Sequence, residues 1–73
     1  MKLKIITPKQ LVLDAEVTQV TLPGAEGEMT ILPGHTFLMA KLKKGILRAP
    51  NHSLEISGGL VEVSLDHITV LTA

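Results

Sequence analysis

The sequence predicts an all-β domain, a two-layer sandwich or flattened barrel of eight to ten short strands. Apolar and polar residues alternate with a period of two through most of the chain, as they do in strands with one buried face. Glycine and proline separate the alternating runs at short intervals. No stretch shows the apolar periodicity of a helix longer than one turn.

The amino-terminal runs alternate regularly. Residues 2–6 alternate lysine with apolar residues until Pro8 interrupts them, and residues 11–18 resume the alternation. The phase then reverses at Val20. Because a shift of one residue moves every side chain to the opposite face, we expect a bulge or a strand break near Gln19.

Further runs follow at short intervals. Residues 36–42 and 46–49 are expected to form two strands joined around Lys44 and Gly45. All six glycines are expected at strand ends, where they permit a turn. The remaining predicted strands cover residues 20–22, 29–31, 53–57, 60–64 and 68–72.

The last predicted hairpin is connected by Leu65-Asp66-His67. This connection lacks the Asn-Gly pair that a tight two-residue turn prefers. Leucine tolerates a positive φ poorly, so we expect a longer or bulged loop here.

The buried faces of these runs supply the candidate core. The chain has 73 residues, enough for one small domain, and 45% of them are hydrophobic. Without cysteine, neither a disulfide nor a thiolate metal site supports the fold. Our candidates for the interior are Leu13, Val20, Leu22, Ile31, Leu54, Ile56, Val61, Val63 and Val70.

Composition argues against several functions. Seven acidic and seven basic residues cancel, and Phe37 is the only aromatic residue, so we expect no nucleic-acid partner. No apolar run approaches the roughly 20 residues that span a bilayer. The start MKLKIITP is too short in its apolar part for a signal peptide. We therefore expect a cytosolic protein that reaches a membrane only through partners.

No constellation of residues indicates catalysis. The three histidines, His35, His52 and His67, fall in separate predicted loops without ligand spacing, so no metal site is expected. Gly24-x-x-Gly27 lacks the lysine and helix of a phosphate loop, and the glutamates beside it would repel phosphate. We expect a protein with no catalytic residues and no cofactor.

Two surface features leave alternatives open. The basic run KLKKGILR (residues 41–48) is either a solvated hairpin tip or a docking patch for an acidic partner or anionic lipid. Phe37, Leu38 and Met39 are apolar in succession, so at least one of them must leave the buried face. An exposed Phe or Met at a sandwich edge would mark a protein contact.

Four motifs together carry a family resemblance. KLKIITP, VTLPGAEGEMTILPGH, ISGGLVEVS and ITVLTA occur in this order along the chain. They resemble the amino-terminal domain of the epsilon subunit of F-type ATP synthase over essentially the whole chain. The resemblance implies a flattened sandwich and a non-catalytic role in the central stalk. There the domain joins the gamma subunit to the ring of c subunits, and so couples proton or sodium flow to ATP synthesis at the cytoplasmic face of a bacterial energy-coupling membrane.

The resemblance also implies which residues meet each partner. The acidic loop and the following Pro-Gly-His are expected at one end of the sandwich, facing the ring and gamma. The expected c-ring contacts are Gly27, Glu28, Met29 and Thr30. The expected gamma contacts are Pro33, Gly34, His35, Leu38 and Met39. Such a joint transmits torque, and a proline before each of Gly24 and Gly34 would stiffen its turns.

Members of this family usually continue into two regulatory helices, whereas this chain ends at Ala73, so we expect either a naturally short form or the separate β-sandwich domain of a longer member. No inhibitory or nucleotide-binding role is therefore carried over. The alternative is a small stand-alone all-β binding module, or a swinging-arm carrier with a modified lysine at a hairpin tip, at Lys41 or at Lys43-Lys44.

Overall fold

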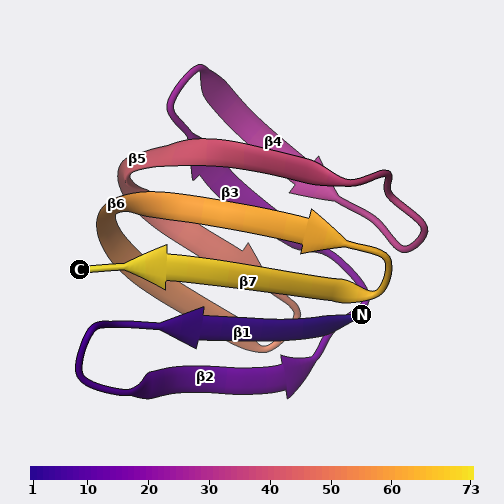
Figure 1. Ribbon diagram of the computed structural model, residues 1–73, viewed down its shortest axis with the longest axis horizontal. Coiled ribbons are helices and arrows are strands. Elements are labelled where there is room, and N and C mark those ends of the chain that lie inside the picture. The colour runs from indigo at the N-terminus through magenta and orange to yellow at the C-terminus, as the bar shows by residue number, and fades with distance from the viewer.

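The computed structural model describes residues 1–73, and all of its regular elements are strands, which confirms the all-β class (Figure 1). The strands are β1 (Lys2–Ile6), β2 (Leu11–Glu16), β3 (Val20–Gly24), β4 (Gly27–Ile31), β5 (Leu38–Ala49), β6 (His52–Ser64) and β7 (His67–Thr72). They form one hydrogen-bonded sheet in the order β2-β1-β7-β6-β5-β3-β4, and only β1 and β7 pair in parallel.

The single sheet folds over on itself to make two layers. β5 and β6 curve together around the left side of Figure 1, and each runs through both layers. The first layer holds β2, β1, β7, residues 59–64 of β6 and residues 38–42 of β5. The second layer holds residues 52–57 of β6, residues 44–49 of β5, β3 and β4.

Two long strands explain why the structure has seven strands rather than eight to ten. The predicted pair 36–42 and 46–49 lies in the single strand β5, and the pair 53–57 and 60–64 forms β6. Gly45, Gly58 and Gly59 therefore lie inside strands, at the bends, and not at strand ends. The prediction failed because a sharp bend and a turn both need glycine.

The bend of β5 passes around Pro23 of β3. Thr21 pairs with Arg48 and Gly24 pairs with Leu42. An advance of three residues along β3 therefore corresponds to an advance of six residues along β5, and β5 must bow outward between the two pairs. Pro23 has no N–H to offer β5, and it is buried in the space that the bowed strand leaves. A Cβ atom on Gly45 would lie 2.8 Å from Cβ of Pro23. Only glycine therefore fits where β5 comes closest to the Pro23 ring.

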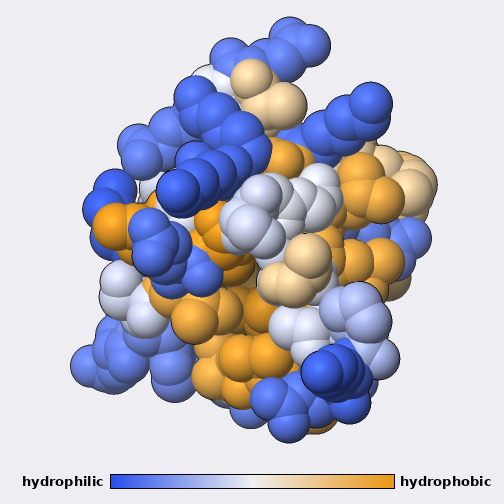
Figure 2. Space-filling model, turned by 90° about the vertical axis from the view of Figure 1, so that its left-hand side faces the viewer, coloured by the Kyte–Doolittle hydropathy of each residue, from blue (hydrophilic) through white to orange (hydrophobic).

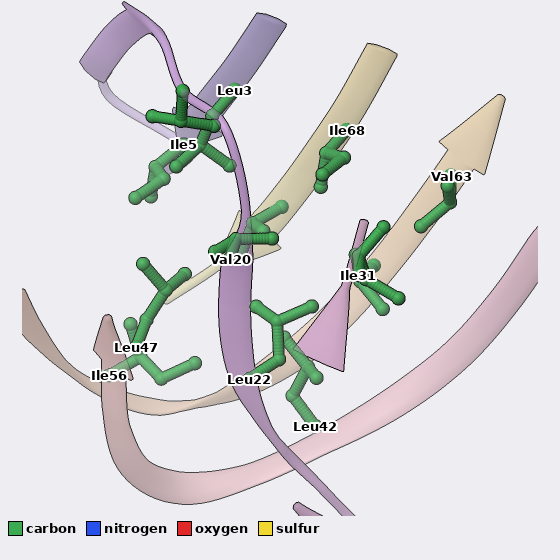
Figure 3. Close-up of a cluster of buried hydrophobic side chains, with 13 residues drawn as sticks. Leu3, Ile5, Val20, Leu22, Ile31, Leu42, Leu47, Ile56, Val63 and Ile68 are labelled. Atoms are coloured by element: carbon green, nitrogen blue, oxygen red, sulfur yellow. The ribbon is translucent and has the colours of Figure 1, made fainter. Parts of the chain in front are cut away.

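The core lies between the two layers (Figure 3). Seven of the nine predicted interior residues are buried, whereas Leu13 and Leu54 are half-buried. Both line a hollow near the start of β6, where the layers do not close completely. The cluster also includes residues that we did not predict for the interior, namely Leu3, Ile5, Val17, Leu42, Leu47 and Ile68.

The two local expectations about chain reversals have opposite outcomes. The break near Gln19 is confirmed, since β2 ends at Glu16 and β3 begins at Val20. The longer loop expected at Leu65 is wrong, because Ser64 pairs directly with His67 and Leu65 adopts φ 50°. The backbone N–H of Lys2 donates to the Asp66 carbonyl at 2.7 Å, which ties this turn to β1 and compensates for the strained leucine.

A matched pair of glycines tests how much the bend of β6 depends on the missing side chain. Gly27 and Gly59 have similar φ values, 138° and 143°, but a Cβ atom on Gly27 would meet open space, whereas one on Gly59 would collide with the Leu71 carbonyl oxygen. Gly27→Ala should lower the free energy of unfolding by about 1–2 kcal/mol through backbone strain alone. Gly59→Ala should lower it at least twice as much, measured by urea denaturation. Equal losses would show that the close approach at residue 59 is unimportant.

The strained turn offers a stabilising substitution. Leu65 is 80% exposed and contributes little packing, so no side-chain contact offsets the backbone strain of its positive φ. Leu65→Asn should raise the free energy of unfolding by about 0.5–1 kcal/mol, because asparagine tolerates the left-handed region. Thermal unfolding followed by circular dichroism measures the change. A lower melting temperature would mean that the leucine side chain has a packing role.

Candidate partner-binding surface

The first Leu-Pro-Gly step belongs to a tight hairpin and not to an open loop. Gly24 at the end of β3 pairs with Gly27 at the start of β4, leaving Ala25 and Glu26 at the tip. A Cβ atom on Gly24 would lie 2.5 Å from the Gly27 carbonyl oxygen, so the hairpin needs glycine there. The backbone N–H of Ala25 donates to the Lys41 carbonyl at 2.8 Å. The tip is therefore held against the bend of β5.

The second Leu-Pro-Gly step is a turn at the other end of β4. The backbone N–H of His35 donates to the Leu32 carbonyl at 3.3 Å, and Gly34 has φ 82°. Proline followed by glycine with a positive φ is the arrangement of a type II turn. The Nδ1–H of His35 donates to the Thr36 carbonyl at 2.7 Å and so fixes the imidazole ring.

The two steps do not lie at one end of the sandwich, as the sequence had led us to expect. The five residues of β4 separate them by on the order of 15 Å. The correction follows from the secondary structure, since the strand that we predicted over residues 29–31 begins already at Gly27 and holds the two steps at its opposite ends. The hairpin tip and the proline turn are therefore two separate rigid elements.

Alternation along β4 divides the four expected c-ring residues. Glu28 and Thr30 point to solvent, whereas Met29 packs against the core between them. The hydroxyl groups of Thr30 and Thr21 lie 3.0 Å apart across the β3–β4 pair. Glu28 accepts from Arg48, whose Nη2 is 3.3 Å from Glu28 Oε2. Exposed ion pairs of this kind add little stability, but this one orients the carboxylate.

The five expected gamma residues are divided in the same way. Pro33 and Gly34 are exposed and His35 is half-buried, all in the turn before β5. Leu38 packs against the core, whereas Met39 is 63% exposed. Phe37 is exposed as well, so two of the three consecutive apolar residues leave the buried face.

Arg48 is a member of this surface that sequence reasoning did not pair with Glu28. The two residues are 20 positions apart, and β3 lies between their strands, so no local pattern relates them. The basic run, residues 41–48, lies within strand β5. The prediction that this run forms a hairpin tip is therefore wrong. Lys43, Lys44, Arg48 and Glu28 line one shallow hollow on the outer side of the second layer. The site for a swinging-arm lysine is absent as well, because a carrier presents it at a hairpin tip.

The structure shows no group of three histidine or carboxylate residues close enough to hold a metal ion. It also contains no helix that could cross a membrane. The polar residues described above are exposed at the surface and partly engaged with one another. This arrangement can make hydrogen bonds and ion pairs to another protein.

Comparison with known proteins relates this surface to a family. The profile of the ATP synthase delta/epsilon chain β-sandwich domain matches residues 1–73. The ATP synthase epsilon chain of Dehalococcoides mccartyi is 45% identical over 97% of this chain. That of Lawsonia intracellularis is 45% identical over 99% of it, and that of Bacillus subtilis is 39% identical over 97%. The chain spans 54–57% of the length of these three relatives.

Solved structures agree with the sequence relatives. A chain of the Euglena gracilis mitochondrial ATP synthase, in a structure of OSCP, F1 and the c-ring, has a TM-score of 0.83 and 28% identity. The match covers 96% of this chain and 48% of that one. A chain from the central stalk and c-ring of the Tetrahymena thermophila mitochondrial ATP synthase has a TM-score of 0.81 and 16% identity. The match covers 97% of this chain and 61% of the Tetrahymena chain, and it shows that the two share a fold. The chain therefore belongs to the ATP synthase delta/epsilon chain family and has the fold of its β-sandwich domain.

Proposed function

We propose that the chain is a non-catalytic subunit of the central stalk of an F-type ATP synthase, where it joins the gamma subunit to the c-ring. The match of the family profile to all 73 residues carries this proposal. In this role the chain transmits rotation between ion flow through the ring and ATP synthesis in F1. It has no cofactor of its own and binds no nucleic acid. It lies at the cytoplasmic face of the membrane, held there by the complex.

The c-ring contact is made by the outer side of the β3–β4 hairpin. Glu28 and Thr30 present a carboxylate and a hydroxyl there, on a strand whose two ends are fixed by the hairpin and by the proline turn. Charge-assisted hydrogen bonds from the ring loops to the carboxylate would be stronger than neutral ones. Gly27 and Met29 support this contact from within, Gly27 through the turn and Met29 through the core.

The gamma contact is made by the proline turn and the start of β5. Pro33, Gly34 and His35 form a rigid projection, and Met39 adds an exposed, adaptable apolar side chain beside it. Leu38 holds β5 in place through the core. A joint of this kind depends on the shape of the turn more than on any single charge.

Cysteine cross-linking in the assembled enzyme tests the c-ring contact. Glu28→Cys should form a disulfide-length cross-link to a cysteine in a c-subunit loop, because residue 28 faces outward on the hairpin. Glu62→Cys is the matched control, since it replaces another exposed glutamate, on the first layer. If position 62 reached the c subunits and position 28 did not, the proposed orientation would be reversed.

Two substitutions of Gly34 test the shape of the gamma-facing turn. A Cβ atom there would meet open space, so any effect comes from the φ of 82°. Gly34→Val should cost about 1–3 kcal/mol of turn stability and reduce co-assembly with gamma, because a β-branched residue is strained at this φ. Gly34→Asn should retain assembly. Identical assembly of both variants, measured by co-purification with gamma, would rule out a role for the turn's shape.

A further inference from the structure

Basic residues gather on β5. Four of the chain's seven lysine and arginine residues belong to this strand, although acidic and basic residues balance over the whole chain. Three of the four, Lys43, Lys44 and Arg48, line the shallow hollow on the outer side of the second layer. Figure 2 shows the side of the molecule on which β5 and β6 bend, and long hydrophilic side chains project from its upper part, at the height of β5 in Figure 1. The function proposed above assigns no ligand to these cations.

The hollow forms where β5 bows around Pro23. Pro23 and Gly45 line it together with the charged residues, and the two are in direct contact, since a Cβ atom on Gly45 would lie 3.3 Å from Cγ of Pro23. Both residues are short, whereas the lysine and arginine side chains beside them are long. The result is a depression with basic groups around it.

Two of the cations around this hollow have no partner. Arg48 contacts Glu28 at 3.3 Å, but neither Lys43 nor Lys44 takes part in any of the ion pairs of the structure. Glu55 of β6, opposite Ile46, is a second carboxylate on this face but does not line the hollow. Within the hollow, three cations therefore face one carboxylate. This excess of positive charge favours an anionic ligand.

The remaining residue of the hollow indicates which kind of anion fits. Ile46 is 46% exposed there, beside the lysines. Aliphatic and basic side chains occur together in this way on amphipathic helices that lie at the boundary of lipid headgroups and acyl chains. A free phosphate ion would make no use of the isoleucine. The hollow also adjoins Glu28, which the proposed function turns toward the c-ring, so this face would lie near the membrane surface.

We propose that the hollow binds the phosphate group of an anionic phospholipid headgroup, with Lys43 and Lys44 as its ligands and Ile46 at the acyl-chain boundary. The orientation toward the membrane rests on the proposed function. Lysine binds phosphate as a point charge, so the two ammonium groups need no fixed geometry. Arg48 remains paired with Glu28. A site with so few cations binds weakly by itself and therefore assists, rather than replaces, assembly with the protein partners.

Two double variants with the same loss of charge test the proposal. The measurement is cosedimentation with vesicles of phosphatidylglycerol and phosphatidylcholine in equal parts, and with vesicles of phosphatidylcholine alone. At about 0.1 M salt the screening length is about 10 Å, so distant charges contribute little. Lys43→Gln/Lys44→Gln should weaken binding to the anionic vesicles by about 10- to 30-fold, because each cation near such a surface contributes about fivefold. Lys4→Gln/Lys9→Gln, whose lysines do not line the hollow, should change it within about twofold. Circular dichroism confirms that both variants remain folded.

The outcomes separate this inference from the proposed function. If the unmodified chain did not prefer the anionic vesicles, or if the two double variants lost affinity equally, the lipid site would be overturned and the proposed function would stand. Vesicle binding as expected by a chain that binds neither gamma nor the c-ring would overturn the function and leave the site.

Two further measurements identify a different occupant. Calorimetric binding of inorganic phosphate that Lys43→Gln/Lys44→Gln abolishes, without any preference for anionic vesicles, would assign the hollow to a free anion. If the same variant kept its affinity for anionic vesicles but lost affinity for the detergent-solubilised c-ring, the occupant would be an acidic side chain of the ring. Either result would contradict the proposal.

Discussion

The structure depends on two close approaches at the bends of β5 and β6, one to the ring of Pro23 in β3 and one to the backbone of β7. Gly59 comes so near the Leu71 carbonyl, and Gly45 so near Pro23, that a side chain at either position would push the strands apart. The bend brings the two layers face to face and closes the core of a domain too small to rely on core size alone. One sheet folded over on itself thus takes the place of the disulfides or metals that support many small domains.

This closure leaves two outward faces with different chemistry. The second layer presents Glu28, Thr30 and Arg48, which are polar and paired with neighbours. The first layer presents the apolar side chains of Ile6, Leu60, Leu71 and Met39. The proposed role, joining two different partners in a rotating stalk, requires separate surfaces and a stiff body between them. The continuous strands β5 and β6 supply the stiffness, because each of them belongs to both layers.

Local patterns in the sequence predicted the strands and most of the core, since alternation reports directly which face is buried. They could not distinguish a bend from a turn at Gly58-Gly59, because both use the same residues. The strained Leu65 was missed because a long-range hydrogen bond from Lys2 supports it. The Glu28–Arg48 pair and the apolar row of Ile6, Leu71 and Leu60 both depend on strand register, which becomes known only when the sheet order is known.

The central claim is that the two faces bind two partners at the same time. Native mass spectrometry of the chain mixed with purified gamma and a detergent-solubilised c-ring tests it most directly. The account predicts a ternary complex with one copy of the chain and one of gamma on each ring, formed in either order of addition. Displacement of the ring by gamma, or of gamma by the ring, would mean that both partners use one surface and would contradict the account.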